Sequence, residues 1–356
     1  MPGIRFQAEE LLSVATRIFA AIGVPQDIAR TVAETLVDAN LMGHDSHGVL
    51  RIPQYVTAAR KGLVDVTARP RRASANGATV LVDGEWAFGQ ITGRLAMDEA
   101  VGLAHEHGIG AAAAIRCAHL GRVGDYVERA AARGCVGMAW VGGLIPAAVP
   151  YGGRTRALGT NPIAVGFPVA GDHPVVLDFA TTVIAAGKVA AARAAGKALL
   201  PGRIVDQDGR PATDPEVFYS GGALLPFADH KGYALSTIVD LVGQVLTGAD
   251  RPLTARRGDD LPGQRHSGAL FVAVSAGAFR PAERTASTAR SIVDRLRNVP
   301  PAPGFDRVLT PGQPEALMRA RRLRDGIEVA EATWRAIRET AAAVGLAPED
   351  LPGPMA

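Results

Sequence analysis

The sequence predicts an α+β fold in which helices from both chain ends flank a middle part of mixed strands and helices. Apolar residues recur every three or four positions over about the first sixty residues, and again over residues 314–346. Between these regions, short apolar runs alternate with Gly and Pro. An amphipathic helix must bury its apolar stripe. We therefore expect residues 1–70 to pack with residues 305–346, beside an α/β part over residues 71–304.

The first part of the chain is expected to hold three helical stretches. Leu11, Ala15 and Ile18 keep a helical period that Gly23 can end. A second stretch begins at Pro25 and is broken at Gly43. A polar segment over residues 44–48 follows, after which the chain turns helical towards residue 59.

The middle and the tail are predicted from shorter patterns. Buried strands are expected at residues 79–83, 135–141, 175–178 and 270–274, and helices at 95–107 and 233–246. The Ala-rich stretch 189–200 fits either a helix or a mobile loop. The tail is expected to be helical, with one face formed by Ile327, Ala330, Trp334, Ile337 and Ala341.

Composition excludes several classes of protein. The 38 basic residues exceed the 35 acidic ones by only three and are scattered along the chain, so we expect no nucleic-acid partner. Two cysteines do not make a disulfide framework. No apolar run reaches the roughly 18 residues of a membrane span, and the first residues do not form a signal peptide. We expect a cytoplasmic protein without a membrane partner.

Residues 108–113 spell G-x-G-x-x-A, the form of a dinucleotide-binding fingerprint. That fingerprint must follow a strand and open a helix. Here a predicted helix comes before it and a strand-like run comes after it. The pattern is therefore interpreted as a helix stop.

The strongest local pattern is the polar segment that runs from Gly43 to Arg51, Gly-His-Asp-Ser-His-Gly-Val-Leu-Arg. His47 and Arg51 are four residues apart and face one side if the segment is helical. A guanidinium can grip a carboxylate, and an imidazole can exchange a proton with the oxygen beside it. The pair thus suits a substrate with a carboxylate next to a carbonyl. The alternative is a polar helix cap at the surface.

Other polar residues have two interpretations each. Asp178 ends an apolar run and is either a turn residue or the orienter of a catalytic imidazole. Thr181 and Thr182 can bond phosphate or ribose. His119 alone favours a structural histidine. The remaining candidates are a turn with Thr160 and Asn161, and the start of a helix with His230 and Lys231, whose amides can face an anion.

Seven of these segments, in this order, resemble the malate/L-lactate dehydrogenase family of the second type, also called the malate/ureidoglycolate/sulfolactate dehydrogenase family. They span residues 45 to 312. The matching pieces are Asp45-Ser46-His47-Gly48 with Arg51; His119-Leu120-Gly121 before Gly124-Asp125-Tyr126; Gly159-Thr160-Asn161-Pro162; Leu177-Asp178-Phe179-Ala180-Thr181-Thr182 with Ala186-Gly187-Lys188; Asp208-Gly209-Arg210-Pro211 with Thr213-Asp214-Pro215; Lys231-Gly232-Tyr233; and Pro311-Gly312.

The resemblance implies an oxidoreductase that uses NAD or NADP, with a non-Rossmann cofactor-binding fold on a mixed sheet, and a homodimer. It implies that His47 is the acid/base, that Asp178 is its partner and that Arg51 holds the substrate carboxylate. Substrate contacts are assigned to Ser46, His119, Thr160 and Asn161. Cofactor contacts are assigned to Asp178, Phe179, Ala180, Thr181, Thr182, His230, Lys231, Pro311, Gly312 and Gln313.

Three functions remain open at this point. The first is hydride transfer between the nicotinamide and C2 of a small 2-oxo or 2-hydroxy acid of malate or lactate type. The second is reduction of a cyclic imino acid, whose C=N bond also stands beside a carboxylate. The third, of another class, is a metal-dependent hydrolase or lyase that uses the H-D-x-H spacing with His44, Asp45, His47, His119 and His230. A non-catalytic binding protein that keeps the fold is a further alternative.

Overall fold

The two ends of the chain pack together in one hydrophobic cluster. A computed structural model of the protein describes residues 3–143, 145–194, 196–249, 268–347, 349 and 351–353. The cluster joins side chains such as Ile18, Leu36 and Trp334, and it includes Phe88 from beyond residue 70. The boundary at residue 70 therefore stays a prediction. The helices of these end regions are α1 (Ala8–Ala21), α2 (Gln26–Leu41), α3 (Ile52–Arg60), α10 (Gln313–Asp325) and α11 (Glu331–Ala343).

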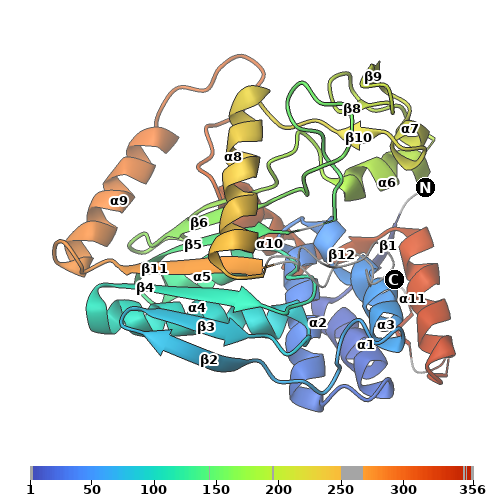
Figure 1. Ribbon diagram of the computed structural model, residues 1–356, viewed down its shortest axis with the longest axis horizontal. Coiled ribbons are helices and arrows are strands. Elements are labelled where there is room, and N and C mark those ends of the chain that lie inside the picture. The colour runs from blue at the N-terminus through green and yellow to red at the C-terminus, as the bar shows by residue number, and fades with distance from the viewer. Residues whose placement is uncertain are drawn as a thin grey trace.

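The tail is not one continuous helix, and this corrects the prediction. Gly326 has φ 82° and ψ 163°, which ends α10. The chain then forms β12 (Ile327–Val329), which pairs antiparallel with β1 (Ile4–Phe6) at the other end of the chain. Ile327 is thus a strand residue and Ala330 is exposed. Figure 1 shows the blue and red ends of the chain side by side.

A mixed seven-stranded sheet forms the middle of the molecule, so the protein has an α+β fold. Among the described pairs only β3 and β4 run parallel. Alternating burial along β4 and β5 follows from the two-residue period of a strand. In sheet order the strands are β2 (Arg71–Asn76), β3 (Thr79–Asp83), β4 (Ile109–Ile115), β11 (Gly268–Ser275), β5 (Cys135–Gly142), β6 (Ile163–Phe167) and β7 (Val175–Phe179).

Helices cover both faces of this sheet, and two glycines permit their close approach. A Cβ on Gly137 would meet Ala130 of α5 (Gly124–Ala132) at 2.6 Å. A Cβ on Gly142 would meet the backbone of Val239 in α8 (His230–Leu241) at 2.7 Å. Positions 137 and 142 point to opposite faces of β5, so α5 and α8 lie on opposite sides (Figure 1). The long α4 (Gly89–His107) packs on the sheet beside α5.

A smaller sheet lies at the end of β7. Its antiparallel strands pack with an Ala-rich helix that starts at residue 186, so the helical alternative for this stretch holds as far as residue 194. The elements of this region are β10 (Ala223–Leu224), β8 (Ile204–Val205), β9 (Pro211–Ala212), α6 (Ala186–Ala194) and α7 (Pro215–Tyr219). The π-helical turn η3 (Val242–Leu246) extends α8, and α9 (Ala282–Arg297) leads back towards the chain end.

The G-x-G-x-x-A pattern at residues 108–113 is a helix stop followed by a strand. Gly108 is the left-handed C-cap of α4, with φ 85°, and β4 begins at Ile109. The prediction made from the flanking residues is confirmed.

Candidate active site

The polar segment after α2 is held in place by residues from both ends of the chain. It forms two short 3₁₀ turns, Asp45–His47 and Val49–Arg51. The buried Asn40 amide donates to Asp45 and accepts from the backbone of Val49. Arg322 of α10 makes two bonds to the Asp45 carboxylate, at 2.6 and 3.0 Å. Asp45 is therefore an anchor for the segment.

His47 and His119 lie face to face although they come from distant parts of the chain. Their ring centroids are 5.7 Å apart and their planes differ by 6°. Ser46 Oγ lies 3.0 Å from His47 Nδ1, and His47 Nε2 has no hydrogen-bond partner among the described residues. The imidazole can therefore present its Nε2 edge to a ligand.

The neighbours of His119 fix its tautomer. The backbone N–H of Gly121 donates to His119 Nδ1 at 3.3 Å, and the Tyr55 hydroxyl lies 2.8 Å from the same nitrogen. The Gln90 amide in turn donates to the Tyr55 hydroxyl. An imidazole nitrogen that accepts from a backbone N–H carries no proton, so Nε2 of His119 is the donor in the neutral ring.

Arg51 stands next to both imidazoles without an acidic partner in the described part of the chain. Its Nε donates to the Ser46 carbonyl at 2.7 Å and its Nη1 to Gln54 at 2.6 Å. Nη2 makes no hydrogen bond there. Half-buried cations are ordinarily paired, so this guanidinium is a ready site for an anion.

The environment keeps both imidazoles neutral. Burial, and then the positive charge of Arg51, lower the pKa of His47 to about 3. The same two causes hold the pKa of His119 well below its usual range. An anion bound at Arg51 would offset one of these causes.

Asp178 lies beside His44 and Arg122, and the structure does not bring it into contact with His47. The backbone N–H of Gly124 donates to Asp178 Oδ2 at 2.8 Å. Burial raises the pKa of Asp178, while Arg122 and then His44 oppose the rise. Burial lowers the pKa of His44, which lies 3.6 Å from Glu315. Direct support of His47 comes from Ser46.

The segments assigned to the cofactor surround β7. The backbone N–H of Val176 donates to the Pro311 carbonyl at 3.2 Å. The exposed Phe179 ring packs edge-on against Phe227, which precedes α8 and its exposed first residues, His230 and Lys231. Ala180 is half-buried, and the hydroxyls of Thr181 and Thr182 donate to backbone carbonyls. Gln313 accepts from Thr310 and Arg297.

The turn with Thr160 and Asn161 is bonded to the end of β7 and to α8, and not to the histidines. The Thr160 carbonyl accepts from Thr181, which attaches the turn to the end of β7. Asn161 is fully buried, with φ 37°, and its amide donates to Ser236 and Asp240 of α8. Its Oδ1 has no hydrogen-bond partner in the part of the chain that the structure describes. Asn161 thus anchors α8, and its assignment to substrate stays a prediction.

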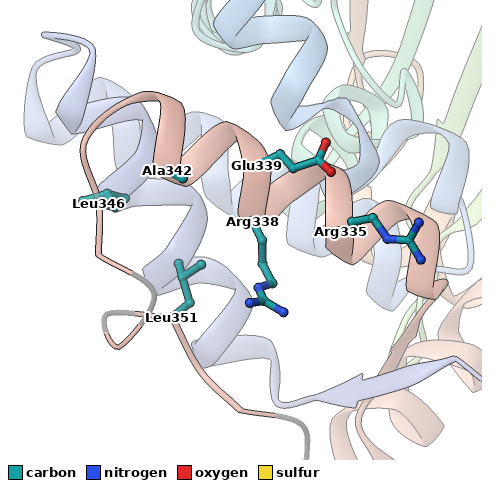
Figure 2. Close-up of a pocket in the computed structure, with 6 residues that line it drawn as sticks. All are labelled: Arg335, Arg338, Glu339, Ala342, Leu346 and Leu351. Carbon is teal, nitrogen blue, oxygen red and sulfur yellow. The ribbon is translucent and has the colours of Figure 1, made fainter.

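A cavity of about 470 Å³ lies beside these segments. It is lined by side chains of α5, the β6–β7 turn, β7 and α10. Val176 and Gly312 belong to its wall, as do Glu128, Asp172 and His173. A smaller hollow of about 330 Å³ lies on α11 and the segment after it, between Arg338 and Leu351 (Figure 2), and none of the predicted site residues lines it.

The histidines proposed for a metal site have other partners. Among the described residues, no group of three or more His, Cys, Asp or Glu side chains is arranged to hold a metal ion. His44 pairs with Glu315, Asp45 with Arg322, and His230 packs against Tyr151. The residues of the H-D-x-H pattern therefore do not converge.

Sequence reasoning missed several residues of this site. Arg122 stands inside a stretch that was noticed, between Gly121 and Gly124, and a buried arginine there pairs with Glu128. Tyr55 and Gln90 support His119, and Glu315 reaches His44. Only the spacing around Arg122 offered a signal, because the other contacts join distant segments.

Comparison with known proteins places the chain in a class of oxidoreductases. A family model described as malate/L-lactate dehydrogenase matches residues 6–338. Hydroxycarboxylate dehydrogenase B of Escherichia coli O157:H7 is 34% identical over 98% of this chain and 97% of its own length. A Δ1-pyrroline-2-carboxylate/Δ1-piperideine-2-carboxylate reductase of Pseudomonas putida is 34% identical over 94% and 96%. The solved structure of sulfolactate dehydrogenase from Methanocaldococcus jannaschii superposes with a TM-score of 0.87 at 31% identity, covering 98% of this chain and 99% of that one.

The chain belongs to the malate/L-lactate dehydrogenase family, and the resemblance noticed in the sequence is confirmed. It is accordingly an oxidoreductase. Its relatives are dehydrogenases of small hydroxy acids and reductases of cyclic imino acids. Within the described residues, no helix combines the length and the apolar character that a membrane span requires.

Proposed function

We propose that the protein transfers a hydride between NAD(P) and C2 of a small 2-oxo or 2-hydroxy acid, with His47 as the acid/base. The single observation that carries this proposal is the Arg51 guanidinium, which has no acidic partner among the described residues and lies beside two neutral imidazoles. An anionic group bound at Arg51 would present its neighbouring carbonyl to His47 Nε2. The relatives that act on hydroxy acids support this choice.

The three side chains have distinct roles in the proposal. Arg51 binds the carboxylate and orients C2, an effect that lowers the barrier by positioning. His119 donates from Nε2 to the substrate oxygen. His47 gives a proton to that oxygen in reduction and takes it in oxidation. Substrate binding neutralises the charge of Arg51, so the pKa of His47 rises when its proton is needed.

We propose that Asp178 belongs to the site, but not as the direct partner of His47. Its carboxylate acts on His44 and Arg122 and borders the cofactor segment 178–182. We propose that it positions these groups, while Ser46 orients the ring of His47.

The surroundings of β7 fit a nicotinamide dinucleotide. A cavity of about 470 Å³ with mostly apolar walls adjoins Val176 and Gly312, which is suitable for a nucleoside. The residues proposed to hold the cofactor are those of segments 178–182, 230–231 and 311–313. We propose that binding does not use a Rossmann fingerprint, since residues 108–113 form a helix stop. The bound nicotinamide supplies the hydride chemistry.

The proposal is tested by mixing the protein with a panel of 2-oxo acids and cyclic imino acids and either reduced cofactor. Oxidation of NAD(P)H, followed by absorbance, is expected with at least one 2-oxo acid. Failure with every member of the panel would contradict the proposal.

The cyclic imino acid remains the second candidate, because a reductase of such acids has the same 34% identity to the chain as the hydroxycarboxylate dehydrogenase. The same geometry serves both substrates. Arg51 would bind the carboxylate, and His47 would protonate the ring nitrogen. The panel above separates the two candidates.

We also propose a homodimer. Four large apolar side chains, spaced as one helical face, are exposed on α8 and its π-helical extension: Ile238, Leu241, Val245 and Leu246. Contiguous apolar patches of this kind mark contact surfaces. The cytoplasmic location inferred from the sequence stays a prediction.

A further inference from the structure

The cavity beside β7 has the mixed lining that is typical of a small-molecule pocket. Its apolar wall includes Ala131, Val169 and Val176, and its charged lining is acidic, with Glu128 and Asp172. No described lysine or arginine belongs to that lining. Small-molecule pockets combine a mostly apolar wall with a few convergent polar groups in this way.

The position of the cavity suits one end of a dinucleotide. Val176 in its wall and Asp178 are two residues apart on β7, so they point to the same face of the strand, ~7 Å apart. Asp172 is six residues before Asp178, which is at most ~20 Å of extended chain. A cofactor with its nicotinamide near Asp178 would therefore direct its adenosine towards Asp172.

Asp172 retains capacity to accept a hydrogen bond. Its Oδ1 accepts from the backbone and from Nδ1 of His173, at 2.8 and 2.5 Å. Its Oδ2 accepts from Arg297 at 2.5 Å. An ionised carboxylate has about four lone-pair positions, so one remains. Burial alone would raise the pKa of Asp172, but the bonds from Arg297 and His173 outweigh it and lower the pKa to about 2.

The neighbouring cations lie outside the cavity lining. Arg297 is fixed by Asp172, Thr310 and Gln313. Arg290 bonds Asp294 at 2.8 Å and comes within 3.5 Å of Asp172. A ligand in the cavity would contact the Asp172 carboxylate. The guanidinium groups of Arg297 and Arg290 would stay bonded to their protein partners.

We propose that this cavity selects NAD(H) over NADP(H), with Asp172 as the specificity-determining residue that accepts from the 2′-hydroxyl of the adenosine ribose. The inference rests on the proposed function, since it assumes a nicotinamide dinucleotide as cofactor. A 2′-phosphate at the same place would bring its negative charge against the carboxylate and offer it no donor, so discrimination comes from repulsion as well as attraction.

The test measures binding with probes that cannot be turned over. Isothermal titration compares ADP-ribose with 2′-phospho-ADP-ribose, and NADH fluorescence gives a second readout. The wild-type protein is expected to bind ADP-ribose at least about tenfold more tightly, the effect of roughly one charged hydrogen bond. In Asp172→Ser the binding of ADP-ribose weakens about tenfold. The phosphorylated probe gains affinity, because Arg297 is released.

Two further variants isolate the cause. Asp172→Ser combined with Arg297→Gln is expected to lose the gained affinity for the phosphorylated probe. Asp294→Asn removes another acidic partner of Arg290 without touching the cavity lining, and is expected to keep the wild-type preference. Thermal unfolding checks that each variant is folded. The ratio of the two probe affinities in the wild-type protein tests the proposal without any variant.

The outcomes separate this inference from the proposed function. Equal or tighter wild-type binding of the phosphorylated probe, or an unchanged ratio in a folded Asp172→Ser variant, overturns the role of Asp172. If neither probe binds while NADH is oxidised by a 2-oxo acid, the pocket assignment fails and the proposed function stands. If ADP-ribose is preferred but no acid is reduced, the assignment is supported and the proposed function fails.

Discussion

His47 and His119 are 72 positions apart in the sequence, yet their rings stack with centroids 5.7 Å apart beside the guanidinium of Arg51. Burial and the charge of Arg51 keep both rings neutral, so each ring has one donor and one acceptor nitrogen. In the proposed mechanism, His119 presents an N–H to the substrate, whereas His47 exchanges its proton with it. This division of labour between two similar side chains is the basis for the first predictions.

Replacing His47 by Gln is expected to slow turnover by roughly 10²–10⁴-fold, the usual contribution of general acid–base catalysis. Cofactor affinity should stay within about twofold, because the segments proposed to hold the cofactor lie around β7. Steady-state kinetics and NAD(P)H fluorescence titration measure the two effects. His107→Gln, a change at an exposed position on α4, serves as the control. Unchanged turnover in His47→Gln would refute the role.

Replacing Arg51 by Leu is expected to weaken binding of the acid substrate roughly 10–100-fold, since hydrogen bonds to charged groups contribute about 1.5–3 kcal/mol. The effect should appear chiefly in KM. The change also removes a positive charge that lowers the pKa of His47, so the pH profile of kcat/KM should shift to higher pH.

Arg30→Leu is the matched control for Arg51→Leu. The exposed Arg30 also lies in the N-terminal helical region, but its only described partner is Glu34, one turn further along α2. Its loss should leave KM unchanged. A KM for Arg51→Leu that equals the wild-type value would show that the guanidinium does not bind the substrate.

The stability of the free protein is expected to fall as the pH decreases from about 6.5 to about 3. Burial lowers the pKa of His44, His47 and His119 in the folded state. In this window these three side chains bind more protons in the unfolded chain than in the folded chain, so their contribution to the free energy of unfolding decreases as the pH falls. Urea unfolding at a series of pH values measures the slope.

His119→Gln tests the origin of this pH dependence. The variant lacks one buried imidazole and should lose less stability between pH 7 and pH 5 than the wild type does. His105→Gln, at an exposed position, should keep the wild-type slope. Identical slopes in all three proteins would show that His119 does not contribute.

Local sequence patterns predicted the elements well where one segment determines its own structure. The period of Leu11, Ala15 and Ile18 defines α1, and the flanks of Gly108 separate a helix stop from a fingerprint. The helix predicted for the tail was wrong at Ile327, because an apolar residue in helical register is equally suited to a strand. The pairing of β12 with β1, 323 positions earlier in the chain, cannot be seen locally.

The candidate site shows the same division. The polar segment around His47 was noticeable because polar groups so close together need partners. Asp45 pairs with Arg322, and Asp178 lies beside Arg122. Both arrangements depend on contacts between distant segments of the chain. The sequence also gave no sign that Ser46 supports His47, since neighbouring residues face one another only in a particular turn.

The last prediction concerns Gly124, where the chain passes close to Asp178. A Cβ at this position would lie 2.5 Å from Arg122 Nη1 and 2.8 Å from Asp178 Oδ2. Gly124→Ala should therefore displace the carboxylate and lower both turnover and cofactor affinity by roughly tenfold or more, as expected when a group that orients a site moves by about 1 Å. Gly102→Ala is the matched control, because Gly102 lies within α4 with open space around its Cβ position. That variant should be stabilised by about 0.5–1 kcal/mol and keep its activity. Equal kinetics for the two variants would mean that the position of Asp178 does not matter for the reaction.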